Sequence, residues 1–86
     1  MLAAELLSRE IRVNAVTPGS IDTGILDKAI PDKDAAAKIR VHASGMVPMK
    51  RFGTSEEIAK AVLFLAFDAT FTTGAELPVD GGWSQL

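Results

Sequence analysis

Side chains that carry acid–base, nucleophilic or metal chemistry are few in this sequence. The 86 residues include no cysteine, no tyrosine and one histidine. A lone histidine in a helix-favouring stretch is usually a solvated surface residue, so we assign His42 to the surface and give it no proton-transfer role. Without cysteine, and with one histidine, the chain can form neither a disulfide nor the usual zinc ligand sets, and we expect no metal site.

Four aspartates are the remaining candidates for metal ligands. Asp22, Asp27, Asp32 and Asp34 are spread along one stretch that is rich in helix-capping residues. Carboxylates in such a stretch commonly accept hydrogen bonds from the first amides of a helix. We therefore interpret them as helix ends rather than as ligands of a cation.

A Pro-Gly pair marks the most suggestive position for a ligand. Pro18 and Gly19 follow an apolar, β-branched stretch, residues 11–17. Proline fixes the turn, glycine lets another group approach the backbone closely, and α/β sheets bind ligands just beyond the carboxyl ends of their strands. The alternative is an ordinary turn that ends a strand, and the pair by itself favours that alternative.

The elements that would position this turn follow from the apolar pattern. Residues 1–10 favour the end of a helix, and residues 11–17 favour a buried parallel strand with both faces covered. Residues 76–80 favour a second strand, and Pro78, which has no amide donor, places that strand at a sheet edge. A strand, a long helical connection and another strand indicate a parallel crossover and an α/β fold.

Between the strands, the sequence predicts three helices. The first covers residues 24–30, and the second runs from an Asp32 cap to Ser44, with Gly45 as its C-terminal stop. Short helices of this kind often form a mobile cover over a site. The third, residues 55–67, begins at a capping box formed by Thr54 with Glu57. Its second half is apolar almost all round, which indicates burial on more than one side.

Composition limits the possible functions. Hydrophobic residues make up 48% and charged residues 23% of the chain, which excludes a disordered tail. The net charge is −2 and no basic stripe is present, so we expect no nucleic-acid partner. No apolar run approaches the roughly 20 residues of a membrane span, and no secretory signal is visible, so we expect a cytoplasmic protein. A chain of this length buries only roughly 63% of its surface, which favours a partner.

Four blocks of residues, in order along the chain, resemble the short-chain dehydrogenase/reductase family. The first is residues 11–19 with Ile21 and Thr23, which is similar to the family's sixth strand and the loop after it. The others are residues 48–53 with 56–59, residues 64–66, and residues 73–74 with 79–82. This resemblance implies the C-terminal part of a Rossmann-type doubly wound parallel sheet, with residues 1–86 forming a partial domain.

The resemblance implies an NAD(P)-dependent oxidoreductase acting on a carbonyl or alcohol substrate, and a cofactor of NAD or NADP for the complete fold. In the family, the residues that match Pro18, Gly19, Ile21 and Thr23 face the nicotinamide ring, the last two binding its carboxamide. The family's glycine-rich turn, its serine and its Tyr-x-x-x-Lys pair are absent, and the latter would lie upstream of Met1. We therefore expect no catalytic residue, no activity and no bound cofactor for this chain alone.

The resemblance also implies a partner. In the family, the elements that match residues 55–67 and 76–80 commonly form a two-fold interface, which implies a homo-oligomer or pairing with a full-length relative. The alternative function is therefore a non-catalytic assembly module built on these two elements. Trp83 is either an anchor of that interface or a lid on the chain's own core. Lys50 and Arg51 either pair with a cofactor phosphate or with Glu56 or Glu57; the surface pairing is favoured.

Overall fold

A computed structural model describes residues 2–86, so that Met1, the first residue of the predicted helix end, lies outside the described part. In chain order the elements are α1 (Leu2–Leu6), β1 (Ala15–Pro18), β2 (Ile21–Asp22), α2 (Ile25–Ala29), α3 (Lys33–Met46), β3 (Gly53–Thr54), α4 (Ser55–Leu63) and β4 (Glu76–Val79). A 3₁₀ turn follows α1, a π-helical turn (Phe64–Asp68) follows α4, and a second 3₁₀ turn (Trp83–Gln85) follows β4.

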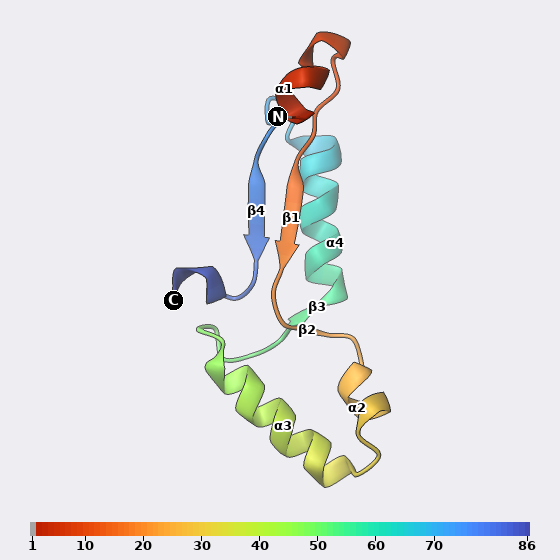
Figure 1. The fold of residues 1–86 in the computed structure, drawn as a ribbon, viewed down its shortest axis with the longest axis vertical. Coiled ribbons are helices and arrows are strands. Elements are labelled where there is room, and N and C mark those ends of the chain that lie inside the picture. The colour runs from red at the N-terminus through yellow and green to blue at the C-terminus, as the bar shows by residue number, and fades with distance from the viewer. Residues whose placement is uncertain (1) are drawn as a thin grey trace.

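The two predicted strands pair in parallel, as the sequence indicates. β1 and β4 lie side by side with Ala15 opposite Glu76 and Pro18 opposite Val79, and α4 runs beside them (Figure 1). β1 begins four residues later than predicted and ends one residue later, at Pro18, whereas β4 begins at Glu76 as predicted and ends one residue earlier, at Val79. Before β1, the Asn14 side chain makes hydrogen bonds where strand pairing would otherwise continue: it donates to the Thr72 carbonyl and accepts from the Ala75 amide. The parallel pairing of β1 with β4, with helices between them in the chain, confirms the predicted α/β crossover.

One face of this small sheet is covered and the other is open. Exposed and half-buried residues alternate along β4 and along the first three residues of β1, and α4 packs against both strands. Val16 and Leu77 are half-buried, whereas Ala15 and Thr17 are exposed. The prediction that residues 11–17 are covered on both faces is therefore wrong for this chain, because no element within residues 2–86 covers the second face.

The predicted cover forms a separate lobe at the carboxyl end of the sheet (Figure 1). As predicted, the Asp32 side chain caps α3 by accepting hydrogen bonds from the next turn. The helix does not stop at Gly45 but continues to Met46. It ends there because Val47 is extended (φ −75°, ψ 133°), the conformation favoured by a residue that precedes proline, here Pro48.

The capping box at the start of α4 is confirmed. The Glu57 amide donates to the Thr54 hydroxyl at 3.1 Å, and the Thr54 amide donates to the Glu57 carboxylate at 3.0 Å. The helix reaches the predicted length, but its last turn is wider than expected. The Ala69 amide donates to the Phe64 carbonyl at 2.8 Å, which is the five-residue spacing of a π-helical turn.

The molecule is elongated and its core is small. Its extents are 54 × 26 × 22 Å and its radius of gyration is 16.7 Å, against about 12 Å for a compact domain of this length. Within residues 2–86, no large side chain is fully buried, and the buried hydrophobic residues are mostly alanines. These buried residues are Ala3, Ala36, Val47, Leu65 and Ala69. Many large apolar side chains are exposed, among them Phe67 and Phe71.

Candidate functional site

The carboxyl ends of β1 and β4 meet in a tight crossing of two backbones. The Gly19 amide donates to the Val79 carbonyl at 3.0 Å, directly after β1 ends. A Cβ atom on Gly19 would lie 2.7 Å from the Asp80 Cα, closer than side chains pack. The close approach that glycine allows at this turn is therefore used by the backbone that follows the chain's own β4.

Asp80 fixes the turn that follows β4. Its carboxylate accepts hydrogen bonds from the amides of Gly82 and Ser84, both at 3.0 Å. Desolvation pushes the pKa of Asp80 upward, but the hydrogen bonds from Ser84 and Gly82 outweigh it and hold the pKa below its ordinary value. Gly81 and Gly82 have positive φ of 63° and 93°, which glycine adopts without strain.

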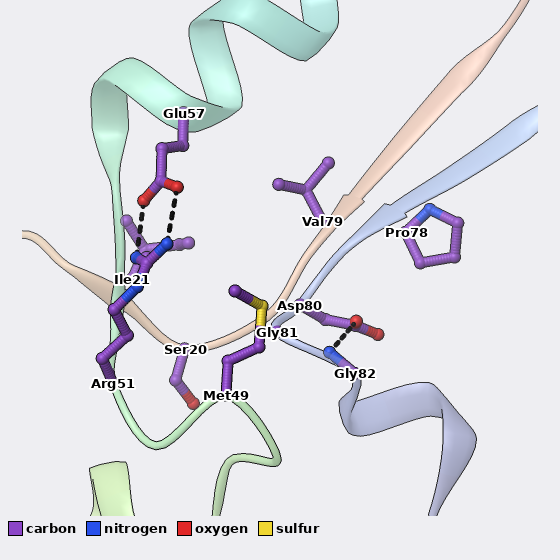
Figure 2. A pocket seen from close by; sticks show the side chains of 11 residues that line it. Ser20, Ile21, Met49, Arg51, Glu57, Pro78, Val79, Asp80, Gly81 and Gly82 are labelled. Carbon is purple, nitrogen blue, oxygen red and sulfur yellow. Dashed lines mark hydrogen bonds and ion pairs between the residues drawn. The ribbon is translucent and has the colours of Figure 1, made fainter.

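A pocket of about 300 Å³ opens between this turn and the start of α4 (Figure 2). Ser20 and Ile21 line it on one side, and Met49 and the Gly81 backbone on another. Its lining combines apolar side chains with exposed backbone, which is the usual character of a small-molecule pocket. It lies beyond the carboxyl ends of the parallel strands, where α/β folds place ligands.

The charge of Arg51 at the mouth of this pocket is already paired. Arg51 Nη1 and Nη2 each donate to one Glu57 carboxylate oxygen at 2.9 Å, as Figure 2 shows. The Arg51 guanidinium, together with the Thr54 amide, lowers the pKa of Glu57 to about 2. The surface pairing favoured from the sequence is confirmed. Lys50 donates instead to the Gly45 carbonyl at 2.7 Å.

A second pocket, of about 240 Å³, lies on the other side of the same loop. Ile21 and Thr23 line it together with residues of the α3 lobe. Arg40 closes one wall: its guanidinium pairs with Asp22 at 2.9 Å and with Asp27 at 3.3 Å. The hydrogen bond from Arg40 lowers the pKa of Asp22, although partial desolvation opposes it. Arg40 therefore fastens α3 to the loop that follows β1.

The four residues predicted to face a nicotinamide ring do not share one surface. Ile21 lines both pockets and Thr23 lines the second. Thr23 is exposed, and its hydroxyl has no hydrogen-bond partner among residues 2–86. Pro18 ends β1, and neither Pro18 nor Gly19 lines either pocket. The structure thus brings together the two predicted carboxamide contacts, whereas the Pro-Gly pair lies outside both pockets.

Two arginines were not singled out from the sequence. Arg40 holds the loop through aspartates 13 and 18 residues earlier in the chain and lies 5.8 Å from the centre of the Phe52 ring. Arg12 reaches the far end of α4. No local spacing signals either contact, because both depend on how distant elements meet. The aspartates themselves act at helix ends and in ion pairs.

Among residues 2–86, no three His, Cys, Asp or Glu side chains are grouped as a metal ion would require. His42 is exposed on α3. Of the helices in the described part of the chain, none is both long and apolar enough to span a bilayer.

Comparison with known proteins relates the whole chain to one group of enzymes. The pattern of a family described as Enoyl-(Acyl carrier protein) reductase matches residues 1–84. The 3-oxoacyl-[acyl-carrier-protein] reductase FabG of Pseudomonas aeruginosa is 48% identical over 82 residues, which are 94% of this chain and 31% of that protein. The glucose 1-dehydrogenase of Gluconobacter oxydans is 49% identical over 82 residues, 94% of this chain and 29% of that protein.

A solved structure resembles this chain over nearly its whole length. A short chain dehydrogenase family protein from Francisella tularensis matches with a TM-score of 0.85 and 31% identity, over 99% of this chain and 38% of that chain. The chain thus spans about a third of the length of the proteins it resembles. With its parallel strands, its loop beyond β1 and a family pattern over nearly every residue, the chain belongs to the short-chain dehydrogenase/reductase family.

Proposed function

We propose that this chain is the nicotinamide-facing, C-terminal part of an NAD(P)-dependent oxidoreductase for a carbonyl or alcohol substrate, and that it transfers no hydride by itself. The loop at residues 21–23 carries the proposal. It follows the carboxyl end of a parallel strand and presents, beside a pocket, an exposed Thr23 hydroxyl that has no hydrogen-bond partner within residues 2–86. The elongated shape and small core support the view that residues 1–86 are part of a domain.

The residues present fit one end of a dinucleotide and not the other. The Thr23 hydroxyl and the backbone at Ile21 suit a carboxamide, which both donates and accepts hydrogen bonds. The cations nearest the two pockets are already occupied: Arg40 by aspartates, Arg51 by Glu57, and Lys50 by a backbone carbonyl. No glycine-rich phosphate turn occurs in the sequence. We therefore assign only the nicotinamide end to these residues.

A bound dinucleotide would supply the hydride, and these residues would set the orientation of its ring. Arg40 would act indirectly, by holding the Asp22 side of the loop against α3. Proton transfer needs a titratable donor within hydrogen-bond reach of the substrate oxygen. The sequence has no tyrosine, and His42 is exposed on α3. The carboxyl group of Asp22 lies at the loop, but its pKa is lowered by the hydrogen bond from Arg40, which favours the ionised form that cannot donate a proton.

We expect the isolated chain to show no saturable binding of NADPH or NADH up to about 1 mM, because the phosphates find no contacts. Fluorescence titration and calorimetry measure this directly, and a turnover assay with a 3-oxoacyl thioester should stay at background. Saturable binding that Thr23→Ala weakens, while the exposed Thr70→Ala variant does not, would overturn the proposal.

A second candidate function, an assembly module, is favoured by the apolar end of α4. Leu63 is 53% exposed, Phe64 is 51% exposed and Phe67 is 72% exposed. Side chains of this size on one helix end form a patch that soluble monomers rarely leave open. A second copy of the chain, packed through α4 and β4, is the partner that the family resemblance implies.

We expect the chain to self-associate through this patch at micromolar concentration. Light scattering should give twice the monomer mass, and Phe67→Gln should weaken association by about tenfold through loss of buried aromatic area. Phe71→Gln is the matched control, because Phe71 is fully exposed and lies beyond the helix. A monomeric mass for the unaltered chain, with a cooperative thermal transition, would contradict the prediction.

A further inference from the structure

The lobe that carries α2 and α3 leaves the sheet after β1 and returns to it before α4 (Figure 1). We call it the cover lobe, residues 20–53. Both of its ends contact the same turn, residues 80–82, which follows β4. Two segments that lie far apart in the chain therefore share one support.

The outgoing end of the cover lobe meets this turn at Gly19. The Gly19 amide donates to the Val79 carbonyl at 3.0 Å, and a Cβ on Gly19 would lie 2.7 Å from the Asp80 Cα. Ser20 and Ile21 follow directly in the chain. The backbone at Asp80 therefore limits where the loop of residues 21–23 can begin.

The returning end of the cover lobe packs against the same turn. The Met49 amide donates to the Gly81 carbonyl at 3.0 Å, and Figure 2 shows Met49 beside Gly81. A Cβ on Gly81 would lie 2.7 Å from Val47 Cγ1, and one on Gly82 would lie 3.0 Å from Pro48 Cβ. Because Val47 is only 3% exposed, this contact belongs to the small buried core.

The two ends of the cover lobe also contact each other. The Gly53 amide donates to the Ser20 carbonyl at 3.0 Å, and β2 pairs in parallel with β3, with Ile21 opposite Gly53. Only a few residues separate Met49 from Gly53, and Thr23 follows Ile21 closely. A continuous set of contacts therefore connects the turn after β4 with the loop assigned to the nicotinamide ring.

Asp80 determines the shape of the turn. Its carboxylate accepts hydrogen bonds from the amides of Gly82 and Ser84, and Figure 2 shows the first of them. Gly81 and Gly82 both have positive φ, and a pair of glycines can adopt many other conformations. The carboxylate therefore favours the one conformation in which the Gly81 carbonyl accepts from Met49.

We propose that Asp80 and Gly81 are positioning residues for the nicotinamide-facing loop: their turn holds both ends of the cover lobe and so fixes where Ile21 and Thr23 lie. They act through the chain around them, and neither is assigned a contact with the dinucleotide. The inference rests on the proposed function, since the loop that they position is the one assigned to the nicotinamide ring.

Hydrogen exchange in the ¹⁵N-labelled 86-residue chain tests the role of Asp80. Each rate is compared with that of the Ala15 amide, which reports the pairing of β1 with β4. Asp80→Ala should speed relative exchange at Met49 by about tenfold, because bonds to a charged group hold the turn, and should also speed Gly53. Asp80→Asn keeps one acceptor oxygen and should recover part of the protection. Asp34→Ala, which alters an exposed carboxylate with no partner within residues 2–86, should change neither amide.

A double-mutant cycle tests Gly81. Gly81→Ala places a Cβ against the Val47 side chain and should speed relative exchange at Met49 by about tenfold. Adding Val47→Ala removes the methyl group that the new Cβ meets, so the two changes together should cost less than their sum. Gly74→Ala is the matched control. Gly74 has a similar positive φ, 74° against 63°, but its Cβ would meet only the Ala3 Cβ, at an ordinary 3.6 Å.

Several results would overturn the inference. Fast exchange at Met49 in the unaltered chain would show that the turn does not hold the returning end, and so would Met49 protection that survives Asp80→Ala. Equal loss of protection at Met49 and Ala15 would assign the turn to the stability of the whole fold. Faster exchange at Met49 alone, with Gly53 unchanged, would contradict the positioning of the loop, and strict additivity in the cycle would remove the role of Gly81. NADPH binding by the chain alone would instead overturn the proposed function and leave these results intact.

Discussion

Replacing Arg12 by alanine should destabilise this chain more than any other single change of a charged residue. Its guanidinium donates to the carbonyls of Leu65, Ala66, Ala69 and Thr72 at 2.7, 2.7, 3.0 and 3.3 Å. Carbonyls in the last turn of a helix have no partners within the helix, and a cation there also opposes the negative end of the helix dipole.

We expect Arg12→Ala to lower the free energy of unfolding by about 3 kcal/mol, because hydrogen bonds to charged groups are worth roughly 1.5–3 kcal/mol each and these four share one side chain. For a chain of this size that is a fall in Tm of at least about 10 °C. Urea or thermal denaturation followed by circular dichroism would measure it. Arg12→Lys should recover only part of the loss, since a single ammonium cannot span the carbonyls that the planar guanidinium reaches.

Arg9→Ala is the control for loss of charge and of an arginine. Arg9 is exposed, and its side chain makes no hydrogen bond or ion pair within residues 2–86. Its replacement should change the stability by less than about 0.5 kcal/mol. Equal stability of the Arg9 and Arg12 variants would show that the π-helical turn holds its form without the guanidinium.

The difference between Arg12 and its neighbour Asn14 illustrates what the sequence could predict. An amide side chain in an apolar stretch needs a partner, and Asn14 finds one in a nearby loop, where it donates to the Thr72 carbonyl and accepts from the Ala75 amide. Arg12 could have pointed to solvent. The role of Arg12 depends on the π-helical turn that follows α4, and the spacing of apolar residues does not predict that turn.

Local signals were reliable wherever both partners lie within a few residues. The capping box at Thr54, the Asp32 cap and the pairing of Arg51 with Glu57 each join residues two to six positions apart, and all are present. The prediction that α3 stops at Gly45 was wrong because Pro48 determines where the helix ends. A proline disfavours the helical conformation of the residue before it, so Val47 is extended and the helix runs to Met46. The parallel pairing of β1 with β4 was predicted from order and composition, whereas the open second face was not.

The candidate site was predicted in part for the same reason. Ile21 and Thr23 follow β1 so closely that their place at the carboxyl edge was nearly determined. The Arg40 contact was not, since it requires α3 to fold back across the loop. Gly19 was predicted to face a ligand from the Pro-Gly turn and the family resemblance, and that prediction stands untested. The structure adds a contact with Asp80, which lies 61 residues later in the sequence. This contact between the strand ends gives the glycine a structural role that a linear pattern does not reveal.

Replacing Gly19 by alanine tests this assignment. The new Cβ would lie 2.7 Å from both Cα and Cβ of Asp80, and backbone atoms cannot yield as a flexible side chain can. We expect the ends of β1 and β4 to separate, with loss of the hydrogen bond from Gly19 to Val79 and a destabilisation of about 2–3 kcal/mol, as for an overpacked core. Urea denaturation and faster exchange of the Gly19-position amide would report it.

Gly45→Ala supplies the matched comparison, because a Cβ at Gly45 meets nothing within 4 Å and the residue lies inside α3. That variant should gain about 0.5–1 kcal/mol, since alanine is the better helix former. If Gly19→Ala were instead as stable as the unaltered chain, the turn would have room for a side chain, and a ligand would again be the better reason for the glycine. The same substitution in a complete relative would then weaken dinucleotide binding without lowering Tm. Loss of stability in this chain, where the sequence predicts no bound dinucleotide, would assign Gly19 to the crossing of two strands.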